Sequence, residues 1–348
     1  MIVLIFVALL LVITFAAYLL SVGSEKLAEK WGVNIVGSLI LALVTTLPEY
    51  GGWIYSVFNK KRQIEMLWQC PRGLRSKNDP VLMTEPLRGY HARTLGAWPE
   101  IFPHGSSAVE INGIMMPMHG EAVQRAWDHE IVCESGEEAV VRMEVRCHLL
   151  PLTLERVLRV RAEQAILTLE ETVTNYGGVP TDFMWGHHPL FGKPLYNEGS
   201  RIIAPAKQWL DDKGFTPTPW PLNNGHDFSI CPAEKSGVGN MLYLDGLEAG
   251  WIALVNPNEN LGAALSWDHK VFPYVWIWRE ANSAKAYPYF GTAYAVALEP
   301  FSHLPGARQR GEKLLYLDPG ATLKTSLNLT LFEDRSTVNN VTRTGKVE

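Results

Sequence analysis

The chain has 348 residues, enough for roughly two domains of about 150 residues each or for one large all-β domain. Hydrophobic residues make up 47% and charged residues 19%, which excludes a disordered chain and supplies enough apolar side chains for a buried core. A net charge of −5 gives no electrostatic reason to expect nucleic acid as a partner. The four cysteines are too few and too scattered for a disulfide scaffold, and none forms a CxxC pair of the kind that binds zinc. The twelve tryptophans fit either core packing or stacking against sugar rings.

The first segment of the chain is strongly apolar. Residues 1–24 contain no charged side chain, and a helix over residues 1–20 is long enough to span the hydrocarbon core of a bilayer. A cleaved signal peptide would need a basic N-terminal region, but there is no Lys or Arg before Lys26. The sequence therefore predicts a retained transmembrane helix and the lipid bilayer as a partner.

A second apolar run covers residues 31–47, after a short polar patch of Glu and Lys. It is shorter and more polar than the first run, so it is expected to span marginally, to be re-entrant or to be packed. If both runs span, the basic cluster at residues 60–62 places the rest of the chain in the cytoplasm. The predicted membrane segment, with one or two helices, is residues 1–48.

Residues 20–50 resemble the first α-repeat of the sodium/calcium exchanger family, in the pattern "GS…LA…GV…G…A…T-x-PE". In that family the closing acidic residue helps to coordinate the transported cation, which the resemblance places on Glu49. The family needs two repeats and a bundle of helices, whereas this chain has one such segment. We therefore expect a fragment serving as an anchor, with Glu49 as an ordinary polar residue where the chain leaves the bilayer.

The pattern changes after Gly51-Gly52, from unbroken apolar runs to alternation with a period of two residues. Residues 139–147, 165–173 and 323–331 each place apolar side chains on one face and mostly polar side chains on the other, as half-buried antiparallel strands do. No long amphipathic helix is predicted after residue 50. The sequence predicts one large antiparallel β-sandwich over residues 49–335, followed by a polar tail at 336–348.

Three short motifs carry residues suited to acid–base chemistry. They are Met118-His119-Gly120-Glu121, then Trp185-Gly186-His187-His188-Pro189, and Ala297-Leu298-Glu299-Pro300. A carboxylate at the end of an apolar strand tends to have a raised pKa, which suits a base. Adjacent histidines point to opposite faces of a strand, so His187 and His188 cannot both line one pocket.

In this order the motifs "HG…W", "GHHP-x-F" and "ALEP" resemble those of the aldose 1-epimerase (galactose mutarotase) superfamily, and "PE-x-GG-x-I-x-S" at Pro48–Ser56 resembles its early strand. The resemblance covers about residues 47–335. It implies a galactose mutarotase-like supersandwich and an isomerase that interconverts sugar anomers. It also implies that Glu299 is the base, that His188 is the acid and that His119 helps to hold the ring oxygen. This chemistry needs neither cofactor nor metal.

The expected substrate is a small carbohydrate, free or modified. The residues expected to bind it lie in or near the motifs or match the mid-chain Asp of the family: Trp98, Glu100, Trp127, Trp185, His187 and Asp227. Many members of the superfamily carry a sugar-binding Arg before the first His, and Glu100 stands in the corresponding region here. This departure and the "GHHPLFG" form of the second motif indicate a divergent branch.

Other functions remain open from the sequence. The same fold could bind carbohydrate without turnover, which the missing Arg favours. A lesser alternative is an exchanger fragment fused to the β domain, in which the first fifty residues matter most. Glycoside hydrolysis ranks low, because it normally uses two carboxylates about 5–10 Å apart and the motifs supply only Glu299.

Overall fold

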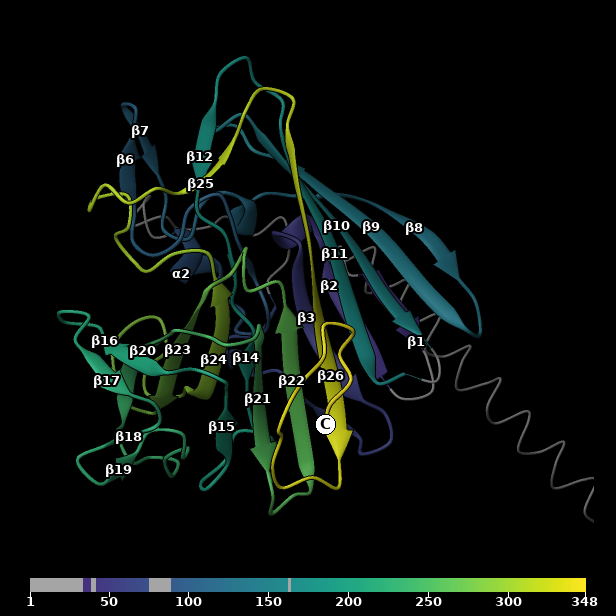
Figure 1. Ribbon diagram of the computed structural model, residues 1–348. Coiled ribbons are helices and arrows are strands. Elements are labelled where there is room, and N and C mark those ends of the chain that lie inside the picture. The colour runs from purple at the N-terminus through teal and green to yellow at the C-terminus, as the bar shows by residue number, and fades with distance from the viewer. Residues whose placement is uncertain (1–33, 39–41, 75–88, 162–163) are drawn as a thin grey trace, which may run out of the picture.

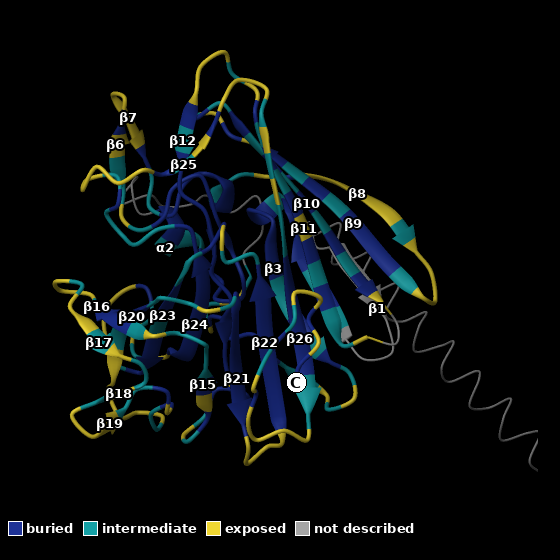
Figure 2. Ribbon diagram, viewed as in Figure 1, coloured by how far each residue is buried: buried dark blue, intermediate teal, exposed yellow. Residues whose placement is uncertain are grey.

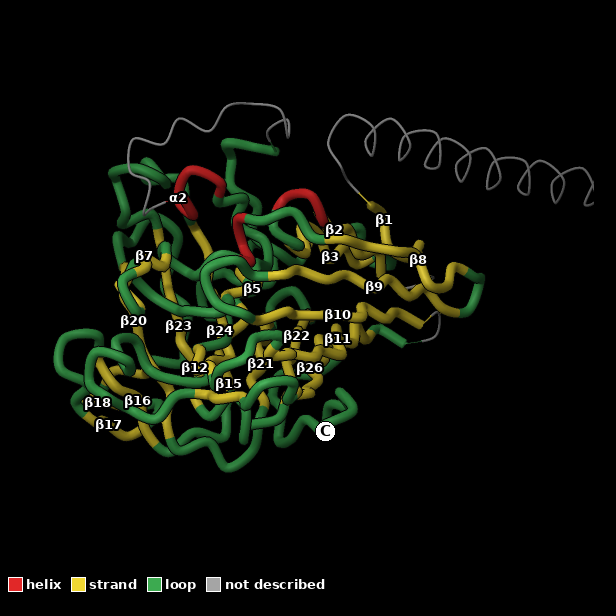
Figure 3. Tube along the Cα trace, turned by 90° about the horizontal axis from the view of Figure 1, so that it is seen from above, coloured by secondary structure: helices red, strands yellow, loops and turns green. Residues whose placement is uncertain are grey.

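The computed structural model describes residues 34–38, 42–74, 89–161 and 164–348. The helix expected at residues 1–24 lies outside the described residues. Within them nearly all of the regular secondary structure is β-strand, and the helical segments are short (Figure 3). The described helices are α2 (Gly89–Arg93) and two 3-10 turns, η1 (Pro48–Tyr50) and η3 (Ala122–Gln124). The expectation of a chain built from strands is confirmed.

The first sheet has eight antiparallel strands in the order β15–β21–β22–β26–β11–β10–β9–β8 (Figure 1). Its strands are β8 (Asp128–Glu134), β9 (Glu138–Arg146), β10 (Leu152–Arg161), β11 (Ile166–Asn175), β15 (Arg201–Ile203), β21 (Trp251–Asn256), β22 (Leu261–Trp267) and β26 (Thr322–Glu333). The expected alternation explains these strands. In β10, Leu152, Leu154, Leu158 and Val160 are all buried, and Arg156 occupies the remaining position on that same face.

The second sheet also has eight strands, in the order β17–β16–β20–β23–β24–β13–β5, with β14 paired to β24. They are β5 (Glu100–Ile101), β13 (Gly186–His187), β14 (Leu190–Phe191), β16 (Gln208–Asp211), β17 (Pro217–Pro219), β20 (Gly239–Asp245), β23 (Tyr274–Ala281) and β24 (Tyr294–Phe301). Three two-stranded ribbons join β6 (Val109–Ile111) to β7 (Ile114–Met116), β12 (Thr181–Phe183) to β25 (Leu315–Leu317), and β18 (Leu222–Asn223) to β19 (His226–Asp227).

The N-terminal sheet corrects the expected second membrane span. β1 (Asn34–Ser38), β2 (Ala42–Leu47), β3 (Trp53–Asn59) and β4 (Ile64–Glu65) form an antiparallel sheet, and β1 lies against β9. The helix prediction for the run at 31–47 is therefore wrong where the run is described. Its Val, Ile and Thr residues suit strands, and a short apolar run does not by its pattern distinguish a buried strand from a helix.

The exchanger resemblance finds no support in this region. Glu49 lies in η1, a single turn between β2 and β3, and not at the end of a helix that could form an ion path. No helix in the described part of the chain is long and apolar enough to cross a membrane. The β-structure expected to begin at residue 49 already includes β1 and β2.

One core cluster joins the three large sheets. It contains Val44 and Trp53 from the N-terminal sheet, Leu154 from the first sheet, and Val275 and Leu298 from the second sheet. Figure 2 shows the buried residues concentrated in the strands from β21 to β24, whereas β8 at the edge of the first sheet is mostly exposed. The sheets are thus layers of one packed unit, as expected for a β-sandwich.

The last residues are also part of the fold, although a polar tail was expected. Val338, Val341 and Val347 pack against the face of β21 and β22 that points away from the main core. The amide of Asn328 in β26 donates a hydrogen bond to the carbonyl of Arg343 at 2.8 Å. Residues 336–348 therefore pack on the outer face of the first sheet at β21, β22 and β26.

Candidate active site

Glu299 lies on the outer face of the second sheet, because of the alternation in β24. Val296 and Leu298 point into the main core, whereas Ala295, Ala297 and Glu299 point the other way. Trp276 in β23 is the direct cross-strand partner of Glu299. The alanines that precede the carboxylate on this face are fully buried and pack in one cluster with Trp68 and Leu190.

The two other residues expected to act in catalysis come from loops next to strands. His188 follows β13, and Gly186 on the same face is required because a Cβ atom there would lie 2.5 Å from the Phe301 ring. His119 follows β7 and precedes Gly120, where a Cβ atom would lie 2.3 Å from the carbonyl oxygen of Phe102. The glycines of both motifs thus allow close packing behind the histidines.

His119, His188 and Glu299 line one cavity of about 220 Å³. The Nε2 atom of His188 lies 3.3 Å from Oε1 of Glu299. The rings of His119 and His188 are 5.8 Å apart between centroids, and Tyr90 of α2 packs edge-on against His119 at 4.4 Å. The structure therefore brings together the three residues that the sequence assigned to catalysis.

Burial dominates the electrostatics of this cavity. It raises the pKa of the Glu299 carboxyl well above its ordinary value and lowers the pKa of His188 to about 4. Burial, followed by repulsion from His188, lowers the pKa of His119 well below its usual range. Burial therefore favours the uncharged form of both groups, the protonated carboxyl of Glu299 and the neutral imidazole of His188.

The pair has few other partners. Within the described part of the chain, the two carboxyl oxygens of Glu299 have no well-aligned hydrogen bond. The same is true of Nδ1 of His188 and Nδ1 of His119. Such buried polar atoms without partners are costly in a folded protein. All three residues line the cavity, so these atoms lie at its edge.

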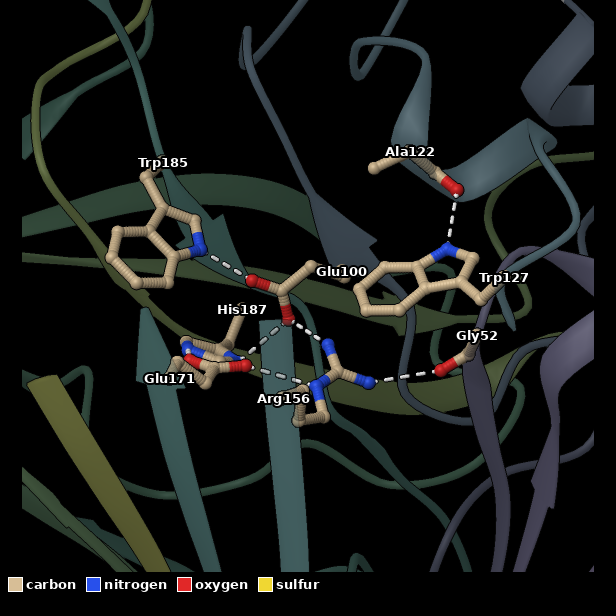
Figure 4. Close-up of polar contacts among 8 residues, drawn as sticks. All are labelled: Gly52, Glu100, Ala122, Trp127, Arg156, Glu171, Trp185 and His187. Atoms are coloured by element: carbon tan, nitrogen blue, oxygen red, sulfur yellow. Dashed lines mark hydrogen bonds and ion pairs between the residues drawn. The ribbon is translucent and has the colours of Figure 1, made fainter. Parts of the chain in front are cut away.

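His187 points to the opposite side of the strand, as expected from the alternation. It is fully buried between the sheets, with Nδ1 at 3.1 Å from Oε2 of Glu100 and Nε2 at 3.1 Å from Oε2 of Glu171. Arg156 completes this inter-sheet network (Figure 4). Its guanidinium contacts Glu100, donates to Glu171 at 2.9 Å and donates to the carbonyl of Gly52 at 2.9 Å.

Strand register explains why these four charges meet. Arg156 in β10 and Glu171 in β11 are direct cross-strand partners on the first sheet. Glu100 in β5 and His187 in β13 are direct partners on the second sheet. The inter-sheet network is thus one pair from each sheet, brought face to face when the sheets pack.

The charges of the inter-sheet network balance. Burial opposes a charge on His187, but Glu100 and Glu171 outweigh it and raise the pKa of His187 to about 9. At neutral pH two cations, Arg156 and His187, therefore neutralise two carboxylates. Ligand atoms of Glu100, Glu171 and His187 lie within 4.8 Å of one another, a spacing that could hold a metal ion. Arg156 already contacts both carboxylates, however, so these residues fit an internal ion cluster better than a metal site.

The residues expected to bind substrate are not at the cavity. Trp98 and Trp185 are fully buried. Figure 4 shows that Trp185 donates to Glu100 and that the ring of Trp127 lies near the Arg156 guanidinium, whose carbon is 4.9 Å from the ring centroid. Together with Glu100 and His187 they form or surround the inter-sheet network. Asp227 lies in β19, where it accepts hydrogen bonds from Ser229 and is 3.9 Å from Arg201. None of these six residues lines the cavity with Glu299.

Sequence reasoning missed most of the cavity wall. Its aromatic residues are Tyr90, Tyr243, Trp276, Trp278 and Tyr289. The wall residues of β20 and β23 could have been found from strand pairing, because Tyr243 and Trp276 are cross-strand partners and Trp276 is opposite Glu299. Once β24 is recognised as the strand that carries the carboxylate, aromatic residues on the neighbouring strand become candidates for the wall.

Comparison with known proteins agrees with this architecture. Residues 103–331 match the family model described as "Domain of unknown function (DUF4432)". The chain belongs to this family. No curated protein matches it in sequence.

Solved structures show the same fold at low identity. The Slr1438 protein of Synechocystis has a TM-score of 0.68 and 16% identity, with 87% of this chain and 96% of that chain covered. A galactose mutarotase-like protein of Clostridium acetobutylicum has a TM-score of 0.64 and 11% identity, with 88% and 100% covered. A galactose mutarotase related enzyme of Lactobacillus acidophilus has a TM-score of 0.60 and 15% identity, with 89% and 99% covered. The chain therefore has a galactose mutarotase-like β-sandwich fold.

Proposed function

We propose that this DUF4432 protein is an aldose 1-epimerase-like isomerase that interconverts the anomers of a sugar. The observation that carries the proposal is the His188–Glu299 pair, which faces a cavity, has unpartnered polar atoms and has pKa values shifted in opposite directions by burial. Titratable groups perturbed in this way are typical of acid–base sites.

The reaction needs one group that holds a proton and one that lacks it. A base takes the proton from the anomeric hydroxyl while an acid protonates the ring oxygen, and the bond between C1 and the ring oxygen breaks to give the open-chain aldehyde. Rotation about the C1–C2 bond and reclosure with reversed proton transfers give the other anomer. A pair sharing one proton meets this need and returns to its starting state after each turnover.

The resemblance makes Glu299 the base and His188 the acid, but in this site each residue can take either role. In the free protein, burial favours the proton on Glu299, so His188 is the neutral partner that can accept a proton. A bound sugar hydroxyl that donates to Glu299 stabilises its ionised form and moves the proton to His188. His119, held edge-on by Tyr90, is the third group that can bond a sugar oxygen.

The position of Glu100 supports the idea of a divergent branch. In place of a sugar-binding Arg, the region carries a carboxylate that is buried in the inter-sheet network. The cavity must therefore bind its sugar with other groups.

Anomer exchange measured by NMR on the full chain tests the proposal. The samples are free aldoses at equilibrium, with Glu299→Gln as the test variant and Glu110→Gln, an exposed residue of β6, as the matched control. We expect exchange above the spontaneous rate in the parent protein and the control, and its loss in Glu299→Gln. Exchange that persists in Glu299→Gln would contradict the assignment. Sugar binding without accelerated exchange would replace it with a carbohydrate-binding module.

A further inference from the structure

The side chains around Glu299 restrict the kind of sugar that fits. We infer that the cavity selects a deoxy sugar without a phosphate, in which at least one ring or side-chain hydroxyl is replaced by hydrogen. This inference rests on the proposed function and names the substrate class of the same site.

The sheet beneath the cavity presents aromatic and thioether groups. Met241 of β20 is the direct cross-strand partner of Trp278 of β23, and both are half-buried residues of the cavity wall. Tyr289 packs against Trp278 with ring centroids 5.3 Å apart. Met118, which precedes His119, adds a second half-buried thioether. Aromatic rings and two thioethers therefore lie in the wall next to the proposed acid–base pair.

The other polar groups of the wall form weaker hydrogen bonds than charged side chains do. Apart from His91 and the three residues at the acid–base centre, the wall offers the hydroxyls of Ser106, Ser107 and the tyrosines, and the indole N–H of Trp278. The indole N–H of Trp276 already donates to the carbonyl of His303 at 3.0 Å. Among the described lining residues there is no Asn, Gln, Asp, Lys or Arg. Among the described lining residues, Glu299 is therefore the only bidentate partner for adjacent sugar hydroxyls, and no Lys or Arg is present to pair with a phosphate.

This composition favours a sugar with fewer hydroxyls. Glu299, His188 and His119 engage the anomeric hydroxyl and the ring oxygen, so the other carbons of the sugar must lie against the remaining wall. A hydroxyl placed on a Met or Trp surface loses water without gaining a partner, whereas a methyl or methylene group is favoured there. Discrimination of this kind is worth about tenfold to a hundredfold in kcat/KM.

The test compares matched pairs of sugars in the anomer-exchange experiment with the full chain. The pairs are D-galactose and D-fucose, D-glucose and 6-deoxy-D-glucose, D-glucose and 2-deoxy-D-glucose, and L-mannose and L-rhamnose. We expect kcat/KM at least tenfold higher for the deoxy member of at least one pair. Catalysed exchange with no deoxy preference in any pair would overturn the inference and leave the proposed function standing. Absence of catalysed exchange for every sugar would overturn the proposed function itself.

Variants link the preference to the wall. Met241→Gln places an amide of similar size beside the sugar, and we expect it to reduce the deoxy-to-parent ratio by about tenfold. Met115→Gln, at an exposed position of β7, is the matched control and leaves the ratio unchanged. Met118→Gln serves in the same way if Met241→Gln does not fold. An unchanged ratio in folded variants at both wall positions would overturn the assignment of specificity to these thioethers.

Discussion

His187 and His188 are neighbours in sequence and lie in opposite electrostatic environments. His187 belongs to a closed network in which two cations meet two carboxylates, and these contacts keep it charged. His188 lies 3.3 Å from a single carboxyl group in the wall of a cavity, and burial keeps it neutral. The opposite charges of this buried network offset one another and hold the two sheets together. The pair at the cavity has no such charge balance and borders a space that a ligand can enter, so it is where function is expected.

The largest expected effect concerns His188. His188→Asn removes one member of the pair that shares a proton, so we expect anomer exchange to fall by about 10²- to 10⁴-fold. The fold is expected to remain, because His188 faces the cavity rather than the core. NMR exchange rates and a melting curve measured on the same sample check both parts. A protein with normal exchange would show that the catalytic histidine is misassigned.

A substitution of Arg156 tests the inter-sheet network. Arg156→Met leaves Glu100 and Glu171 buried with only His187 between them, and we expect the free energy of unfolding to fall by about 3–5 kcal/mol. Urea unfolding measures this change. Exchange per folded molecule should be retained, since Arg156 does not line the cavity. Loss of exchange at unchanged stability would mean that the inter-sheet network takes part in catalysis.

The charge on His187 predicts a pH dependence of stability. Its pKa rises from about 6.5 to about 9 on folding, because Glu100 and Glu171 outweigh the effect of burial. The native state therefore keeps a proton that the unfolded state loses, and the resulting stability is complete below pH 6.5 and is lost as the pH rises through about 9. We expect a loss on the order of 3 kcal/mol across this window. Urea unfolding at pH 6 and pH 9.5 measures it, and a flat profile would indicate a neutral His187.

The smallest expected effect is the pH dependence of anomer exchange, which tests whether His188 is desolvated in the working enzyme. The His188–Glu299 pair is active only while it holds one proton. The kcat/KM profile is therefore expected to fall below about pH 4, where His188 is protonated, and to fall again at a pH set by the raised pKa of Glu299. A limb at the ordinary pKa of histidine, near 6.5, would show that His188 is not desolvated in the working enzyme.

Alternation along strands accounts for what the sequence could reveal. It identified β9, β11 and β26, and it separated His187 from His188. The same alternation could also have predicted a buried ion pair, because Arg156 and Glu171 occupy inward positions among apolar residues of β10 and β11. A charged residue on the apolar face of a strand predicts a buried partner, and the two would have pointed to each other.

Other features lie beyond what the sequence pattern can determine. The apolar run that contains β1 and β2 has no period that separates paired strands from a membrane helix. The tryptophans were expected at a sugar site, yet Trp98 and Trp185 are core residues, because both roles select the same large side chain. The position of Glu100 depends on its pairing with His187 across distant segments, which only the folded chain reveals.

The connectivity of the inter-sheet network also bears on folding kinetics. Arg156 and Glu171 are 15 residues apart on adjoining strands, so their contact closes within one hairpin. The contact of Glu100 with Trp185 joins positions 85 residues apart and forms when β5 pairs with β13 in the second sheet. The contact of Glu100 with Arg156 joins positions 56 residues apart and forms only when the two sheets dock. If docking follows the rate-limiting step, deprotonation of His187 above about pH 9 accelerates unfolding and leaves the folding rate nearly unchanged. The lifetime of the native state, read from the unfolding arm of a chevron plot, would then depend on pH more strongly than the speed of its formation.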